Sequence, residues 1–271
     1  MVPVSSALFI LLCSLPVGVL VGAISGLLGI GGGLVLVPVF YLLLPLAGVQ
    51  PDYLMTMSLA SSLAAVIITS LSSCLAHARL GNVPWQNIPL LLSGLASGAL
   101  MAGYLAALIP AWFLELAFAL FAGAMSIRMW LDQRQAKSEQ SKPYRKFHVL
   151  VATTIIGGVS ALLGIAGGTL LVPYLSSHGM IMKRAIGASA CCGIIVAAAG
   201  TLGYISSGLQ VSHLPEFSIG YVYLPAVLGI AITALFSAPL GAKLASRWPT
   251  RRLKKIVAIM LLLVAVKLLL F

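Results

Sequence analysis

The sequence predicts an all-α polytopic membrane protein made of two inverted repeats. Each repeat is predicted to hold a glycine-tipped, re-entrant helical hairpin and three crossing helices. Of the 271 residues, 61% are hydrophobic and only 8% are charged. Soluble domains carry about 25% charged residues, so the solvent for most of this chain is lipid. A duplicated glycine motif and a one-sided distribution of positive charge complete the prediction.

The duplicated motif occupies residues 22–38 and returns at 157–173. Eleven of its 17 positions are identical at an offset of 135 residues. Each copy is an apolar stretch broken by glycines and closed by a proline, Pro38 or Pro173. This pattern is typical of a membrane helix interrupted at depth. Paired interrupted segments, one in each half, indicate the binding site of a transporter.

The apolar segments divide the chain into two halves joined by a charged linker. We expect an N-terminal membrane repeat at 1–130, a linker at 131–148 and a C-terminal membrane repeat at 149–271. Five apolar segments lie in each half, at 4–30, 33–46, 55–76, 86–108 and 111–130, and at 149–165, 168–178, 185–206, 219–242 and 252–271.

Two of these segments are too short to cross a membrane. As helices, 33–46 and 168–178 would reach only about 15–20 Å, because an α-helix rises 1.5 Å per residue. The hydrocarbon core measures about 30 Å. Each short segment is therefore predicted to form a hairpin with the segment before it, with the glycines at its tip. Whether the hairpins span fully is left open, since 4–30 is itself long enough to cross.

Positive charge sets the predicted orientation. If both ends of each hairpin lie on one side, 15 of the 16 Lys and Arg residues share the side of the linker. That side is the cytoplasm by the positive-inside rule. Both termini then lie outside, and three crossings per half place the second copy upside down. We predict a multi-pass protein of the inner (plasma) membrane.

The basic residues lie in short clusters between apolar runs, which suits anionic lipid headgroups. A nucleic-acid partner is not expected, because it would need a basic face on a soluble fold. The predicted partners are the lipid bilayer and a small anion, and a homodimer is left open.

The glycine tips are the predicted ligand site. Glycines allow positive φ, and the helices that restart after the breaks would aim free N–H groups at the tip, which suits an anion. Serine hydroxyls beside the tips could also donate. The alternative is that the glycines only permit tight helix crossing and that each serine bonds its own i−4 carbonyl. The candidate substrate-binding residues are Ser25, Gly29, Gly31, Gly32, Gly33, Ser62, Ser160, Gly164, Gly167, Gly168 and Ser189.

The remaining polar residues predict no enzyme. No catalytic residue, metal site or cofactor is expected, because the His and Cys residues are scattered. His77 and Arg79 are either anchors at the inner interface or an entry path that attracts anions. The four cysteines form no Cys-x-x-Cys pair, so we expect small buried side chains and no disulfide framework. They are Cys13, Cys74, Cys191 and Cys192.

The motif at Ser25–Pro38, its copy at Ser160–Pro173 and the patches at 60–63 and 187–189 resemble the TauE/SafE sulfite exporter family. The resemblance covers essentially the whole chain. It implies a membrane transporter that moves sulfite, sulfonates or other small anions, often by export. The family's usual threonine is Ser61 in one half and Ala188 in the other, which leaves the substrate open.

Two other functions stay open on the sequence. One is an anion channel of the same fold. The other is thiosulfate-type uptake or a thiol relay that uses Cys191 and Cys192, as the resemblance to a related thiosulfate-uptake group suggests.

Overall fold

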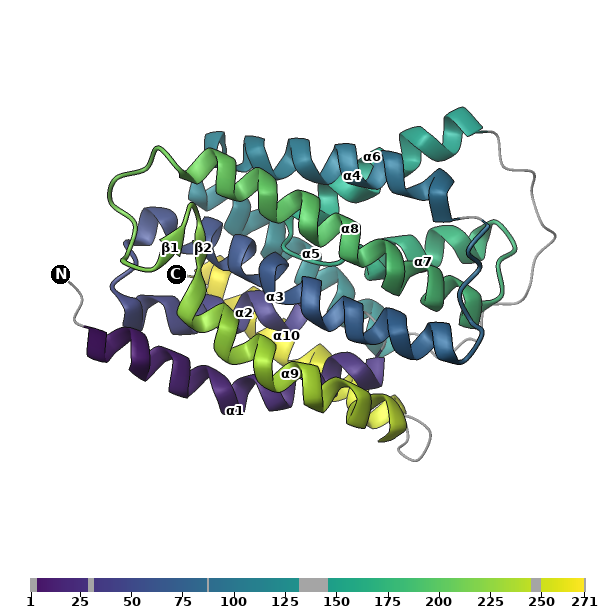
Figure 1. Ribbon diagram of the computed structural model, residues 1–271, viewed down its shortest axis with the longest axis horizontal. Helices are drawn as coiled ribbons and strands as arrows, with labels where there is room; N and C mark the ends of the chain where they lie inside the picture. Colours follow the sequence, from purple (N-terminus) through teal and green to yellow (C-terminus); the bar gives the residue numbers. More distant parts are fainter. Residues whose placement is uncertain (1–3, 29–31, 87, 132–145, 245–249, 271) are drawn as a thin grey trace.

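The computed structural model describes residues 4–28, 32–86, 88–131, 146–244 and 250–270, which fold almost entirely as α-helices (Figure 1). In the first half these are α1 (Val4–Leu28), α2 (Gly33–Leu43), α3 (Pro51–Arg79), α4 (Ile88–Leu105) and α5 (Ala111–Leu131), with short 3-10 turns η1 (Leu44–Ala47) and η2 (Ala106–Leu108). In the second half they are α6 (Lys146–Leu162), α7 (Gly168–Ser177), α8 (Met182–Gly208), α9 (Leu224–Leu244) and α10 (Thr250–Leu270). The ten helices of the described ranges match the ten predicted apolar segments, which confirms the all-α prediction.

Six of these helices are long and apolar enough to cross a membrane. The six candidate spans are Ala7–Ile24, Pro51–Arg79, Ile88–Leu108, Ala111–Trp130, Met182–Gly208 and Leu224–Gly241. The shorter apolar helices lie at Gly33–Ala47, Phe147–Leu162 and Val257–Leu269, so the crossing predicted at 252–271 is not among the candidate spans of the described residues. The chain is therefore a polytopic membrane protein, as predicted. Its two hairpins differ, since α1 has the length of a span and its counterpart α6 does not.

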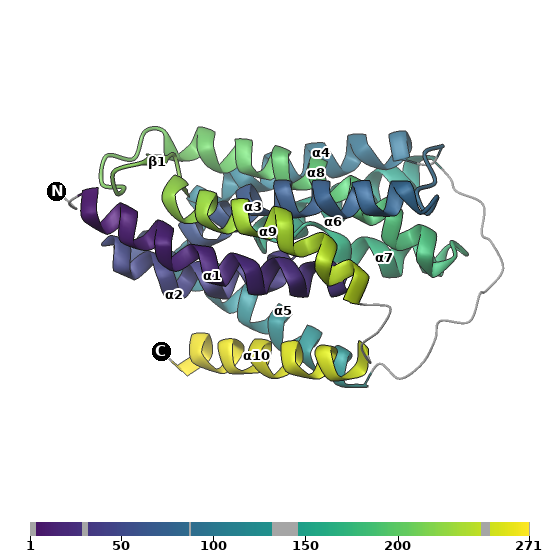
Figure 2. The ribbon, with the colours of Figure 1, turned by 60° about the horizontal axis from the view of Figure 1, so that its bottom comes forward.

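The helices run roughly along one long axis, as Figure 1 shows. The described ends nearest the two termini lie at one end of the molecule, and the ends of α5 and α6 that flank the linker lie at the other. Helices α3 and α8 pack together in the centre, α1 packs on α9, and α4 packs on α6 and α8. Helices α5 and α10 form a pair along one side (Figure 2). The central helices of the two halves are thus in direct contact.

Small residues bring several helix pairs close together. A Cβ atom at Gly98 on α4 would overlap the carbonyl of Thr154 on α6, and one at Gly103 would overlap that of Gly200 on α8. Interfaces of this kind let membrane helices pack without a hydrophobic driving force between them. Tight crossing therefore explains these two glycines, which are not part of the duplicated motif in sequence.

One predicted segment differs in the structure. The helix expected at 219–242 begins only at Leu224, after a two-stranded hairpin of β1 (Ser218–Ile219) and β2 (Val222–Tyr223). Gly220 turns the chain with a φ of 53°. The backbone N–H of Tyr223 then donates to Ser61 Oγ on α3 at 3.1 Å. The hydrophobic pattern missed this hairpin because two-residue strands are too short to show a period.

Candidate functional site

The second glycine motif forms a closed turn at the end of α6. Gly164 adopts a left-handed conformation with a φ of 65°. The N–H of Gly164 donates to the carbonyl of Ala161 at 3.1 Å, and that of Ile165 to Ser160 at 2.9 Å. This bond pair is a Schellman motif, which satisfies the last carbonyls of a helix and favours glycine at the left-handed position. Gly164 therefore has a structural role in ending α6.

Helix α7 restarts after a second left-handed glycine. Gly167 caps α7 with a φ of 76°, and no side chain caps the helix there. Gly32 takes the same place before α2, with a φ of 75°. The carbonyl of each capping glycine accepts the N–H groups three and four residues later. The first N–H groups of both helices thus lack intrahelical acceptors, as expected for helix N-termini.

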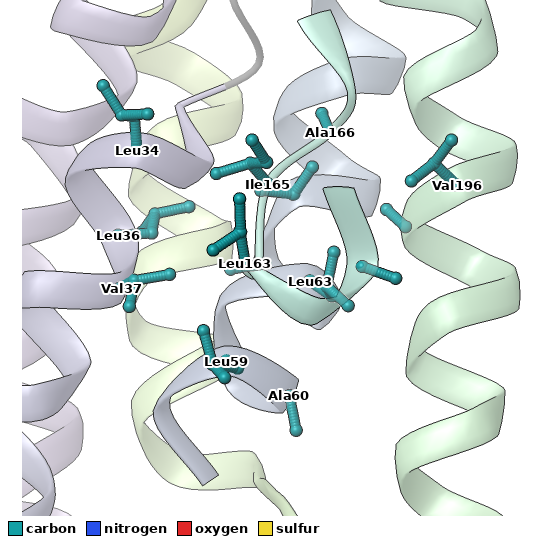
Figure 3. Close-up of a cluster of buried hydrophobic side chains, with 14 of the residues drawn as sticks. Leu34, Leu36, Val37, Leu59, Ala60, Leu63, Leu163, Ile165, Ala166 and Val196 are labelled. Atoms are coloured by element: carbon teal, nitrogen blue, oxygen red, sulfur yellow. The ribbon is translucent and has the colours of Figure 1, made fainter. Parts of the chain in front are cut away.

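The structure brings the two glycine tips into contact. A Cβ atom at Gly33 would lie 2.8 Å from the Gly164 carbonyl oxygen and 2.8 Å from Ile165 Cα, so only glycine fits there without a shift. Ser62 Oγ on α3 donates to the Gly164 carbonyl at 2.8 Å and lies 3.5 Å from that of Gly33. In Figure 3 the second tip runs past Leu163, Ile165 and Ala166 between α2 and α8. The hydroxyl of Ser62 joins the two tips.

Three of the predicted site residues cannot be assigned contacts. Gly29 and Gly31 lie outside the described residues, as does the side chain of Ser25. The other glycines lie at the tips or in the first turns of the restarting helices. They are Gly32 and Gly33 in the first half and Gly164, Gly167 and Gly168 in the second.

Two predicted serines have buried hydroxyls without a hydrogen-bond partner. Ser160 on α6 and Ser189 on α8 are 0% and 2% exposed, and neither Oγ has an acceptor or a donor. Ser160 Oγ lies 3.4 Å from the position of a Cβ atom at Gly167. Most membrane serines bond a nearby helical carbonyl, as Ser58 does to Leu54 at 2.7 Å. Ser160 and Ser189 do not follow that rule.

Sequence reasoning missed two further hydroxyls. Ser70 on α3 and Thr169 in the first turn of α7 are also buried and unpartnered. Ser70 Oγ lies 3.1 Å from the position of a Cβ atom at Gly193, and the Ala166 carbonyl lies 3.0 Å from the same position. Neither residue has an identical counterpart in the other repeat, so the search for duplicated positions overlooked both.

His77 and Arg79 lie in the last turn of α3. Fifteen residues separate Ser62 from His77, which is about 22 Å along a helix. The pair is therefore remote from the glycine tips. The Nδ1 atom of His77 is buried without a partner, while Arg79 is exposed.

The expectation of no disulfide is wrong. Cys74 on α3 and Cys191 on α8 form a disulfide bond across a sequence separation of 117 residues. The two helices bring together cysteines that sequence spacing does not connect. Cys13 and Cys192 are free, and Cys192 is buried. A relay of thiols at Cys191 and Cys192 would first require reduction of this bond.

One carboxylate within a candidate span has a partner. The hydroxyl of Tyr41 on α2 donates to Glu115 Oε1 on α5 at 3.2 Å. Lys267 Nζ on α10 lies 5.8 Å from the centre of the Tyr41 ring. These contacts connect α2 to the α5–α10 pair. Within the described part of the chain, no three His, Cys, Asp or Glu side chains gather as a metal site would need.

The fold and its glycine tips define a class of protein, the polytopic membrane proteins with paired broken-helix hairpins. The family model "Sulfite exporter TauE/SafE" matches residues 14–268. The chain belongs to that family.

Similar proteins carry transporter names. A "Probable membrane transporter protein" of Haemophilus influenzae is 37% identical over 258 residues, which cover 95% of this chain and 97% of that protein. One of Methanocaldococcus jannaschii is 27% identical, with 88% of this chain and 87% of that protein covered. One of Bacillus subtilis is 23% identical, with 93% and 94% covered. No solved structure matches the chain.

Proposed function

We propose that this protein exports a small anion, such as sulfite or a short organosulfonate, across the plasma membrane. The observation that carries the proposal is the meeting of two broken helices, at Gly32–Gly33 and Gly164–Gly168, between the central helices α3 and α8. Free N–H groups at a helix N-terminus favour a negative ligand. The family's printed description names sulfite export.

The two halves of the chain are the proposed moving parts. We take residues 1–130 and 149–271 as inverted repeats that rock against one another around the glycine tips, with the 131–148 linker in the cytoplasm and both termini outside. The contact between Gly33 and Gly164, one from each half, supports alternating access around the tips. The distribution of Lys and Arg supports the orientation.

Flux in proteoliposomes tests the proposal. Purified protein is reconstituted, and efflux of sulfite is followed with and without taurine or thiosulfate as competitors. We expect saturable flux that is accelerated by sulfite on the opposite side. Linear flux without such counter-transport would indicate a channel of the same fold. No sulfite or sulfonate flux above that of protein-free vesicles would contradict the proposal.

A further inference from the structure

Four unpartnered hydroxyls surround the second glycine tip. They belong to Ser70 on α3, Ser160 on α6, Thr169 on α7 and Ser189 on α8, and each side chain is more than nine-tenths buried. A buried hydroxyl without a partner costs about 1–3 kcal/mol. Four such groups in one region are unusual, because a membrane serine or threonine can ordinarily bond a carbonyl of its own helix.

The four groups converge on the segment Ala166–Gly168. Ser160 Oγ lies against Gly167, and Thr169 lies in the turn that Gly167 caps. On α8, the position of a Cβ atom at Gly193 lies 3.0 Å from the Ala166 carbonyl oxygen, and Val196 Cγ2 lies 3.7 Å from the position of a Cβ atom at Gly167. Ser189 lies four residues before Gly193 and seven before Val196, so it shares the face of α8 that is turned to this tip. Ser70 contacts the same Gly193 from α3.

Among the residues that the structure describes, the first tip offers fewer free donors. Ser62, the repeat counterpart of Ser189, already donates to the Gly164 carbonyl. Leu34 occupies the position that Thr169 has in the second copy. The backbone of Gly164 and Ile165 packs against Gly33 in the first turn of α2. The first tip therefore packs against the second and supports it, although the two motifs share 11 of 17 residues.

We propose that the anion binds at the second tip alone, held by the hydroxyls of Ser70, Ser160, Thr169 and Ser189 with the free N–H groups at the start of α7. This inference rests on the proposed function and adds Ser70 and Thr169 to the site. Ser62 stays a structural residue that holds the first tip against the second.

The arrangement also selects a ligand shape. Its donors come from four helices and thus from several directions. A pyramidal or tetrahedral oxyanion presents three or more acceptor oxygens that such donors can reach together, whereas a planar carboxylate presents two. The site therefore favours sulfite and sulfonates over carboxylates of similar size.

Binding to the purified full chain tests this inference. The affinity for sulfite and methanesulfonate is measured by thermal shift or calorimetry, with acetate as the planar comparison. We expect Ser189→Ala and Thr169→Val each to weaken sulfite binding about tenfold or more, the usual effect of losing a hydrogen bond to a charged group. Their thermal stability without ligand should stay the same or rise, because each change removes a buried hydroxyl that has no partner and costs free energy in the folded state.

Two matched variants serve as controls. Thr201→Val removes another buried, unpartnered hydroxyl from α8, twelve residues beyond Ser189, and should leave sulfite affinity unchanged. Ser62→Ala should lower the melting temperature and leave affinity within about twofold, since the tip contact gives it a structural role. Weaker binding in Ser62→Ala at unchanged stability would overturn the one-sided site, as would equal effects of Thr169→Val and Thr201→Val. Absence of binding by the unaltered protein would instead contradict the proposed function.

Discussion

Replacement of Gly33 by alanine tests the contact between the two tips. The new Cβ atom would lie 2.8 Å from both the Gly164 carbonyl oxygen and Ile165 Cα. Ordinary contacts of a Cβ atom begin near 3.4 Å, so these backbone atoms must move by about 0.6 Å. Overpacking of this kind costs about 1–3 kcal/mol. Such a cost lowers the melting temperature by about 2–12 °C in a protein of this size.

The measurement pairs Gly33→Ala with Gly123→Ala. Gly123 lies inside α5, and a Cβ atom there would meet nothing within 4 Å. Alanine in a helix interior is favoured over glycine by about 0.5–1 kcal/mol, so this control should melt at the same temperature or slightly higher. Melting of the purified protein is followed in detergent, and sulfite flux is followed in proteoliposomes. We expect Gly33→Ala to lose stability and flux together. If both variants behave alike in both assays, the proposed contact between tips is refuted.

Three further predictions address orientation, the disulfide and the carboxylate of Glu115. Gln140→Cys should react with a membrane-impermeant maleimide only from the cytoplasmic side, and Ser212→Cys only from outside. The reason is the distribution of Lys and Arg residues, which places the linker in the cytoplasm. Labelling of both positions from one side would contradict the inverted-repeat proposal. Cys74→Ser should free the thiol of Cys191 and lower the melting temperature. The disulfide closes a loop of 117 residues, and the chain-entropy account gives such a bond up to about 5 kcal/mol of stabilisation. Equal melting temperatures of the oxidised and reduced protein would contradict this. Glu115→Gln should cost about 0.5–1.5 kcal/mol of stability, because the hydrogen bond from Tyr41 keeps an acceptor oxygen but loses the charge on it. Sulfite flux should be kept, and lost accumulation at unchanged melting temperature would indicate a proton relay.

Much of the fold could be predicted because its causes are local. The apolar lengths of the segments predicted all ten helices of the described ranges, since backbone groups in lipid must bond within their own segment. The glycine clusters predicted breaks between α1 and α2 and between α6 and α7. Gly32 and Gly167 then take the left-handed conformation that glycine adopts without strain. Among the described residues, the hairpin before α9 is an element that the pattern did not predict.

The candidate site was predicted less completely, because the partners of its groups come from distant parts of the chain. Ser62 and Ser189 occupy equivalent positions in the two repeats, and the sequence treats them alike. In the structure, Ser62 bonds to Gly164, which lies 102 residues away, whereas Ser189 bonds to nothing. The sequence could therefore identify both serines as candidates, but could not distinguish a serine that is bonded to the other tip from one whose hydroxyl is free.

The sequence by itself determined that the chain lies in lipid, that it carries a duplication and that each copy contains a broken helix. These properties follow from composition and from the conformational freedom of glycine, which act within a few residues. The tertiary structure decided that Ser62 is hydrogen-bonded while Ser189 is not, that α3 and α8 are joined through Cys74 and Cys191, and that Ser61 accepts a hydrogen bond from the β1–β2 hairpin. Hydrogen bonds and disulfides form only between atoms a few ångströms apart, and the packing of the helices alone brings those atoms together.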